Sequence, residues 1–425
     1  MTGRALFVVG TVIFLAICGP FLKNLSGMAG LPNWLPLVRD PLVVAVAALG
    51  LTRAPLFTEA RWRWLLLWLL LFVAAYMAVS IVQDRALVGL YYLRFYLLPL
   101  LFCVGMLGLL QRRAEEAEAH QMLRYLMRWN LLLFLFSGGL YVLLLEAPRM
   151  RPALFGTELL PTAWYISGGT WMRMGLPASG PNGLGLVFAL HALLFLQLLL
   201  CLPPRESGPG NGRLMLHLGI ALIGLLLTFS RSSVLLFLLG GLALLLTPGV
   251  LSFVRLAKLL AWSFVALAML AVLALAFDSY SGGLVSRWVA LNIQGRDPSA
   301  LGHLRSVRDA VEHWSEYLLF GYPRGSVGPK ALLFTGKVNN VESSWLGLLY
   351  DMGLFNSLPY LLCVATALAL GYRHRAQWSS LLALAAPFAL LPYVFEADAV
   401  LYCFFIYLAA GFVLTKTAPA QRGAR

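Results

Sequence analysis

Charged residues are scarce in this chain of 425 residues: Asp, Glu, Lys and Arg make up 12% of it, whereas hydrophobic residues make up 60%. A soluble domain carries about 25% charged residues, so the composition excludes an ordinary cytosolic enzyme. The 5 cysteines lie scattered in apolar stretches without a CxxC pair, which excludes a disulfide framework and a zinc site. They are Cys18, Cys103, Cys201, Cys363 and Cys403. We therefore predict an all-α polytopic membrane protein.

Motifs for nucleotides and metals are missing as well. The P-loop pattern GxxxxGK[ST] is absent, so nucleotide binding has no support, and no DxD-like metal site is present. We accordingly expect no metal and no other cofactor. Lys and Arg total 32 against 18 acidic residues, a net charge of +14. On so hydrophobic a chain this excess favours membrane lipids or a phosphate-bearing lipid substrate as partner, and not nucleic acid.

Hydrophobic runs between charged or Gly/Pro breaks predict about twelve membrane-spanning helices, each near the roughly 20 residues that a bilayer requires. The runs are 5–23, 36–52, 64–83, 89–111, 129–147, 182–203, 214–230, 233–249, 258–277, 345–371, 378–395 and 398–415. Residues 1–277 thus hold nine spans with an outer segment near 148–181, residues 278–344 form a large outer loop, and residues 345–425 hold three spans and a tail. We expect the first run to be an uncleaved span and not a signal peptide.

Basic residues of the short loops lie mostly on one side, which places both termini in the cytoplasm by the positive-inside rule. The two long outer segments are nevertheless rich in arginine, and long loops cross the membrane regardless of charge. Two interpretations remain for this basic outer face. It contacts lipid headgroups, or it handles an anionic substrate.

The outer loop contains the best soluble-type helix of the sequence, residues 303–319. An apolar stripe recurs at helical spacing and predicts a helix lying on the membrane surface or against the bundle: Leu304, Val307, Val311, Trp314 and Leu318. Arg305 and Arg308 lie opposite, four residues before Asp309 and Glu312 respectively. These arginines either pair with those carboxylates or contact phosphate directly.

Ionisable residues inside or at the ends of spans are candidates for function. Arg94 lies inside the fourth span and Arg231 at the tight outer turn before the eighth. Each either snorkels toward headgroups or binds phosphate, and at the same outer level they could share one anion. We expect Asp351 to form an interhelical hydrogen bond. At the outer boundary lie a candidate base, Glu342, and a second candidate base, His303. The carboxylates of Glu396 and Asp398 lie there too, and they either bind acceptor hydroxyls or replace Glu342 as the base.

Three patterns resemble elements of one known family. They are RMGLPASGPNGLG (173–185), Arg231 followed by Leu235 in an R-x3-L element, and the outer loop from GHLRSVRDA through FGYPRGSVG to ESSWLGLLYDMGL. Together, and in this order, they resemble the bacterial O-antigen ligase and polymerase family (WaaL and Wzy types). These are polytopic, GT-C-like glycosyltransferases of the inner membrane that use undecaprenyl-diphosphate-linked sugars on the periplasmic face.

The resemblance implies a role for several residues. Arg94, Arg173, Arg231, Arg305 and Arg308 would bind the diphosphate without a metal. Glu342, or else His303, would act as base in an inverting transfer. The undecaprenyl-diphosphate-linked oligosaccharide, a chain-length regulator and a flippase are the implied partners.

The sequence departs from the ligase pattern at one position. Ligases have His-Asn, nine residues and then Gly, whereas this chain has Glu342, Ser343 and then Gly353. The departure favours a polymerase of O-antigen or exopolysaccharide over a ligase that transfers the glycan to lipid A-core. A glycosyltransferase with a monoglycosyl lipid donor and a lipid-linked sugar transporter or flippase remain as alternatives. A transporter would need charges near the membrane midplane and broken helices.

Overall fold

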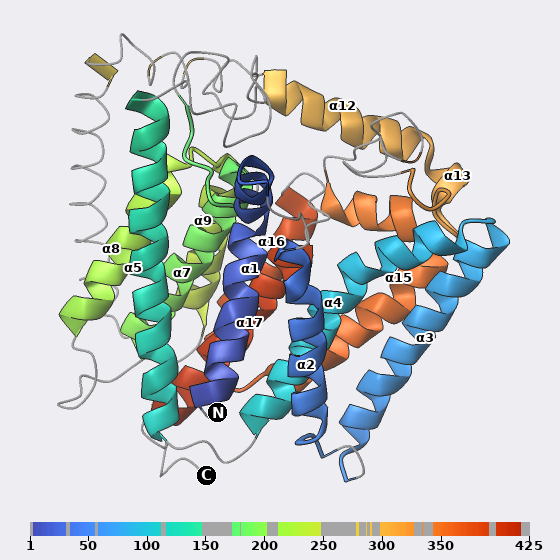
Figure 1. Ribbon diagram of the computed structural model, residues 1–425, viewed down its shortest axis with the longest axis horizontal. Helices are drawn as coiled ribbons and strands as arrows, with labels where there is room; N and C mark the ends of the chain where they lie inside the picture. Colours follow the sequence, from blue (N-terminus) through green and yellow to red (C-terminus); the bar gives the residue numbers. More distant parts are fainter. Residues whose placement is uncertain are drawn as a thin grey trace.

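The protein folds into a helical bundle, described here from a computed structural model (Figure 1). The described residues are 3–30, 35–55, 58–111, 116–146, 172–178, 180–201, 211–247, 278–279, 286, 290, 298–326, 334, 343–390 and 397–417. Helices are the regular elements of this part of the chain. They are α1 (Gly3–Met28), η1 (Leu35–Val38), α2 (Arg39–Leu51), α3 (Ala60–Val82), α4 (Ala86–Gln111), α5 (Glu116–Glu146), α7 (Pro181–Cys201), α8 (Asn211–Leu227), α9 (Arg231–Leu246), α12 (Pro298–Glu312), α13 (Trp314–Tyr317), α15 (Ser344–Gly371), α16 (Gln377–Leu390) and α17 (Ala397–Thr417).

The expected spans coincide with these helices, except for run 258–277, which lies outside the described residues. In the described part of the chain, 5 helices are long and apolar enough to cross a membrane, and 6 if the bent α1 counts as one span. They are α3, α4, α5, α7 and α15. The helices α8 and α9 are apolar but shorter, and α2 has only 13 residues. The chain is thus an all-α membrane protein, and the number of twelve spans stays a prediction.

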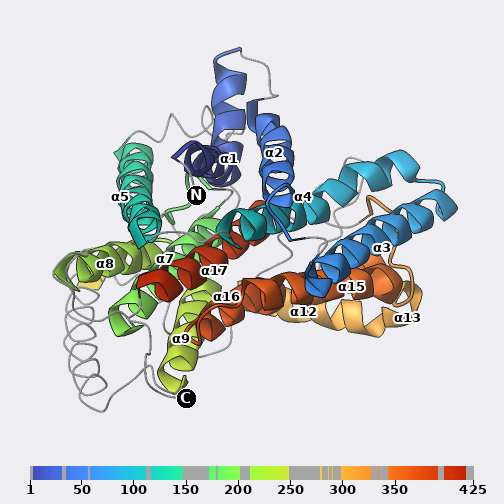
Figure 2. The same ribbon diagram turned by 90° about the horizontal axis from the view of Figure 1, so that it is seen from below.

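Burial divides the helices into inner and outer ones. In α7 the apolar window is 89% buried, and most of the α17 side chains are buried as well. By contrast α3 and α5 expose large apolar side chains, among them Leu70, Val82 and Leu132. Such apolar surface is stable in contact with lipid and not with water. The helices α7 and α17 therefore form the centre of the bundle, and α3 and α5 form part of its lipid-facing rim (Figure 2).

One end of the bundle carries the outer elements. The helix α12 lies across the end opposite to the one where α1 begins and α17 finishes, and α13 continues from it beside α15 (Figures 1 and 2). The helices α2, α4, α7, α9, α15 and α17 all begin at this same end, which follows from the alternation of helix directions along the chain. It is the end that the charge pattern assigns to the outside.

The long helix α15 is broken at Gly353, whose φ of 64° and ψ of 175° are non-helical. The segment before α15 fills the break. Tyr322 donates a backbone hydrogen bond of 2.8 Å to the Tyr350 carbonyl, and the amides of Leu354 and Phe355 donate to the carbonyls of residues 318 and 319 at 2.7 and 3.0 Å. The backbone groups freed by the break are thus hydrogen-bonded to the outer loop and not left bare in the bundle.

The outer amphipathic helix differs from the prediction. Residues 303–319 do not form one helix, because the chain breaks at His313 between α12 and α13. On the expected apolar stripe, Val311 and Trp314 are exposed, which suits a helix that lies on the membrane surface. Ala310 and Tyr317 are buried instead, packed against Tyr350 of α15. Through these two residues the helices α12 and α13 contact the broken span, and spacing along the helix does not reveal that contact.

Candidate anion-binding site

The N-terminal ends of α7 and α9 meet at the outer end of the bundle. Asn182, in the first turn of α7, accepts a hydrogen bond of 3.1 Å at Oδ1 from the Ser230 hydroxyl, directly before α9. Ser233 in the first turn of α9 donates to the Asn182 carbonyl at 3.4 Å, and the Ser230 and Ser233 hydroxyls lie 2.8 Å apart. The positive ends of two helix dipoles are therefore held side by side.

The contact depends on Gly185, the last residue of the segment RMGLPASGPNGLG (173–185). A Cβ on Gly185 would lie 2.8 Å from Ser230 Cβ and 2.8 Å from Thr228 Oγ1, which is closer than side chains tolerate. Pro181 begins α7 at the position where a missing amide hydrogen costs nothing. The sequence GPNGLG thus both starts α7 and lets the turn before α9 approach it.

Arg173 fixes the same turn from the other side. Its Nε donates to the Thr228 carbonyl at 2.9 Å, and its Nη2 donates to the Phe229 carbonyl and to Asn182 Oδ1, both at 3.1 Å. The guanidinium therefore caps the carbonyl end of α8, where a cation is favoured, and ties it to the beginning of α7. Phe229 adopts a positive φ of 49°, which produces the tight turn predicted around Arg231.

Arg173 and Arg231 lie close enough for their charges to interact. Burial, and after it the positive charge of Arg231, lowers the pKa of Arg173 to about 10, so Arg173 is still a cation at neutral pH. Arg231 itself is exposed at the first position of α9. Guanidiniums and helix N-termini are the groups that bind phosphate in proteins, so this place is a candidate site for an anion.

Comparison with protein-family models, curated proteins and solved structures found no match for this chain. The resemblance to the O-antigen ligase and polymerase family rests on the sequence patterns given above.

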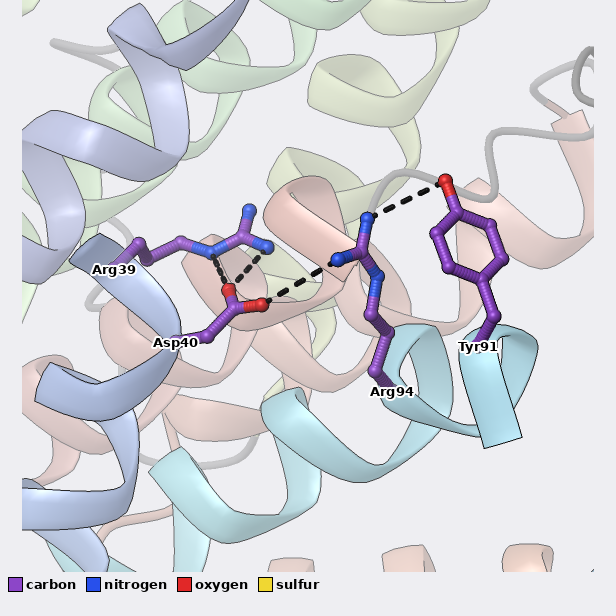
Figure 3. A network of polar contacts seen from close by, with 4 residues as sticks. All are labelled: Arg39, Asp40, Tyr91 and Arg94. Carbon is purple, nitrogen blue, oxygen red and sulfur yellow. Dashed lines mark hydrogen bonds and ion pairs between the residues drawn. The ribbon is translucent and has the colours of Figure 1, made fainter. Parts of the chain in front are cut away.

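Arg94 occupies a different place from Arg173 and Arg231. It projects from α4 toward Asp40 at the beginning of α2, with Nη1 3.7 Å from the Asp40 carboxylate (Figure 3). Arg39 binds the other oxygen of that carboxylate at 2.8 Å. The structure therefore gives Arg94 a neighbourhood formed by α2 and α4. Arg173 instead binds the turn between α8 and α9, and Arg231 follows that turn as the first residue of α9.

The two arginines of α12 are exposed. Arg308 pairs with Glu312 at 2.6 Å, which is the intrahelical pair that the spacing indicated. Arg305 does not form the corresponding pair with Asp309 in the described part of the chain. Of the two alternatives for Arg308, the structure therefore shows the pair with a carboxylate of its own helix.

Four candidate residues fall wholly or partly outside the described residues. Glu342 and Glu396 lie outside them, and Glu342 precedes the first residue of α15 by two positions. His303 lies in α12 and Asp398 in the first turn of α17, at the outer end of the bundle, but their side chains are not described.

Two further charged residues, Asp351 and Arg324, make buried contacts beside the broken span. Asp351 accepts a hydrogen bond of 2.7 Å from the Tyr96 hydroxyl of α4, which confirms the predicted interhelical bond. Arg324, which the sequence marked only as one of many basic loop residues, is fully buried. Its side chain donates to the Asp351 carbonyl and, at 3.2 Å, to the Ser80 hydroxyl, and its guanidinium lies 4.0 Å from the centre of the Tyr76 ring.

The position of Arg324 carries a weak sequence signal. It stands in FGYPRGSVG between Gly321 and Gly325, which both have positive φ, 77° and 83°. A glycine-rich turn of this kind allows the chain to bend sharply and carry a long side chain inward. The side chain of Arg324 is buried at the break in α15, and the sequence does not predict that break.

Proposed function

We propose that this protein is an inner-membrane polysaccharide polymerase, which transfers a glycan from undecaprenyl diphosphate to a sugar hydroxyl of another lipid-linked unit at the periplasmic face. The observation that carries the proposal is the meeting of Arg173, Arg231 and the N-termini of α7 and α9 at the outer end of the bundle. These are two of the three segments that resemble the ligase and polymerase family. A membrane-level anion site suits a lipid-borne diphosphate.

The reaction requires a leaving group and a base. A bond forms between the acceptor oxygen and the anomeric carbon while the bond from that carbon to the diphosphate oxygen breaks. Arg173 and Arg231 stabilise the charge that develops on the departing undecaprenyl diphosphate. Glu342 takes the proton of the acceptor hydroxyl, with His303 as the second candidate, and Glu396 and Asp398 bind acceptor hydroxyls. One displacement of this kind inverts the anomeric carbon.

One observation favours a transporter: the span α15 is broken, and two buried ionisable residues, Arg324 and Asp351, lie at the break. Broken helices in transporters present freed backbone groups to a solute. In α15, however, the carbonyls of Tyr350 and Asp351 and the amides of Leu354 and Phe355 all bind the outer loop. The break therefore serves the attachment of that loop, and the enzyme remains the better proposal.

The decisive experiment is transfer of radiolabelled glycan by the purified protein in detergent with EDTA. The donor is an undecaprenyl-diphosphate repeat unit from the source organism, supplied with and without lipid A-core acceptor. A ladder of products from the donor alone supports the polymerase. Product only with lipid A-core replaces it by the ligase, and no product in either tube from folded protein contradicts both.

Two substitutions assign the chemistry within that assay. We expect Glu342→Gln to abolish transfer while donor binding remains. Normal activity of Glu342→Gln would remove Glu342 as the base, and loss of activity in a His303→Gln variant alone would transfer that role to His303.

A further inference from the structure

Two side chains of opposite charge are buried at the break in α15 without contacting each other directly. Arg324 and Asp351 both have an exposed fraction of 0%, and Asp351 lies seven residues after Ser344, which is about 10 Å along the helix. Their charges are close enough to interact, but the ion pairs in the described part of the chain do not include these two residues. Charges inside a membrane bundle require partners, because hydrocarbon offers none.

The contacts of Arg324 hold its guanidinium away from the carboxylate. Its Nη1 donates to the Asp351 carbonyl, and its Nε donates to the Ser80 hydroxyl at 3.2 Å. The backbone of Arg324 is fixed as well, since its amide donates to Gln83 Oε1 at 3.1 Å and its carbonyl accepts from Arg85 Nη1 at 3.2 Å. A direct ion pair with the carboxylate would therefore break hydrogen bonds that this arginine already makes.

Each of the two charged groups keeps one unpaired polar atom. Asp351 accepts the Tyr96 hydroxyl at Oδ2, whereas its Oδ1 is shielded from solvent with no hydrogen-bond partner among the described residues. The same holds for Nη2 of Arg324. An unpaired buried atom is most costly when its group is charged. Buried polar atoms of folded proteins that do not meet directly are commonly joined by ordered water.

Further unpaired oxygens lie on the same side of α15. Asn356 Oδ1 and Ser357 Oγ are shielded from solvent and lack a hydrogen-bond partner in the described part of the chain. These residues precede Tyr360 by four and three positions and so share its face of the helix. The Tyr360 ring lies 5.7 Å from the ring of Tyr96, which binds Asp351. The interface of α15 with α4 is therefore polar at this level, as a site for internal water must be.

We propose that an internal water molecule is bound between Nη2 of Arg324 and Oδ1 of Asp351 and completes a water-bridged ion pair inside the bundle. The water accepts a hydrogen bond from the guanidinium and donates one to the carboxylate. The two charges balance, so the outer loop enters the membrane helix without adding a net charge to it. The site holds whichever reaction the protein catalyses, because it involves none of the residues assigned to transfer.

Hydroxyl radicals that X-rays generate from bound water test the site in the full chain in detergent. A radical formed from an internal water oxidises the aromatic side chains beside it, even where these are buried. We expect Tyr96 to be oxidised several-fold faster than Tyr407. Tyr407 is the matched reference, because it is buried too and its hydroxyl donates to the Leu368 carbonyl at 3.0 Å. Equal rates for the two tyrosines overturn the water site.

Removal of both charges tests what holds the water. In a variant with Arg324→Met and Asp351→Leu, we expect the oxidation of Tyr96 to fall to the rate of Tyr407. Tyr76→Phe is the matched control, since it keeps both charges and the ring that lies 4.0 Å from the guanidinium carbon. It should leave the oxidation of Tyr96 unchanged. Fast oxidation of Tyr96 in the double variant overturns the assignment of the water to the two charged groups.

Thermal unfolding tests whether the two charges act as a pair. Asp351→Leu leaves the Arg324 cation buried without its counter-charge, so part of what Arg324 contributes is already lost in that variant. We expect Arg324→Met to lower the melting temperature less in the Asp351→Leu background than in the wild type. Equal decreases in the two backgrounds overturn the pair.

A density map of the protein in lipid nanodiscs, at a resolution that shows ordered water, locates the molecule. We expect density within hydrogen-bond distance of both Nη2 of Arg324 and Oδ1 of Asp351. A direct hydrogen bond between these two atoms overturns the bridge and replaces it by an ordinary buried ion pair.

Discussion

Gly321 of the outer loop packs backbone against backbone on Gly353, the residue at which α15 breaks. A Cβ on Gly353 would overlap the Gly321 nitrogen, and a Cβ on Gly321 would overlap the Asp351 carbonyl. Both glycines also have positive φ, and the φ and ψ of Gly353 fall in a region that only glycine adopts. The two glycines therefore allow the loop to enter the break.

Replacement of Gly353 tests this relationship. We expect Gly353→Ala to destabilise the protein by about 2–5 kcal/mol, because it adds backbone strain to a steric overlap. Thermal unfolding of the purified protein in detergent measures the change. The control is Gly139→Ala, at a helical position of α5 with open space around it, which should be neutral or stabilising by about 0.5–1 kcal/mol. Equal melting temperatures for the two variants would contradict the assigned strain.

The hydrogen bond between Tyr96 and Asp351 should contribute to stability. Tyr96→Phe leaves the buried carboxylate without this donor, and we expect a loss of about 1–3 kcal/mol. Tyr76→Phe removes a buried hydroxyl that has no hydrogen-bond partner among the described residues, so it should be neutral or slightly stabilising. Denaturant or thermal unfolding compares the two. A greater loss of unfolding free energy in Tyr76→Phe than in Tyr96→Phe would contradict the stabilising role of the Tyr96–Asp351 hydrogen bond.

Arg324 should matter for stability in spite of its place in a loop. Arg324→Met keeps much of the side-chain volume but leaves the Asp351 carbonyl and the Ser80 hydroxyl without their donor. We expect a loss of about 2–4 kcal/mol and faster proteolysis of the outer loop. Arg305→Met, at an exposed position of α12, should stay within about 0.5 kcal/mol of the wild type. An Arg324→Met variant as stable as the wild type would contradict the contribution of these hydrogen bonds to stability.

Substitutions of Arg173 and of Arg231 should differ in their effects on stability and on transfer activity. Arg173 binds three acceptors around the α8–α9 turn, so Arg173→Lys should lower both stability and transfer activity, since lysine cannot span those acceptors. Arg231 is exposed at the first position of α9, and we expect Arg231→Gln to reduce kcat/KM by about 10²–10³-fold. Unfolding and transfer are measured on the same preparations. An Arg231→Gln variant with normal transfer would contradict its place at the leaving group.

The positions of the helices follow from sequence more directly than their contacts do. Hydrophobic runs located the helices because a membrane helix hydrogen-bonds its own backbone and needs only length and apolarity. The turn before Arg231 was predictable because this charged residue lies between two short hydrophobic runs, 214–230 and 233–249. The hydrogen bond of Asp351 was predictable from the cost of burying a carboxylate without a partner.

Contacts between distant segments were not predictable in this way. Arg94 meets Asp40, which lies on another helix, and no local pattern links the two. The break in α15 falls inside the hydrophobic run 345–371 and does not divide it, and Arg324 is buried at that break. Ala310 of α12 packs in turn in one cluster with Tyr350, a residue of the broken span.

The attachment of the outer loop inside α15 has a consequence for engineering. Residues 317–324 complete the hydrogen bonding of a membrane helix. This stretch and the first turns of α15 must therefore be exchanged together in a chimera. A chimera that imports the loop from another chain must import the broken helix with it. A graft that stops at residue 343 would pair a foreign loop with a native gap, and the backbone groups at that gap would be exposed to hydrocarbon.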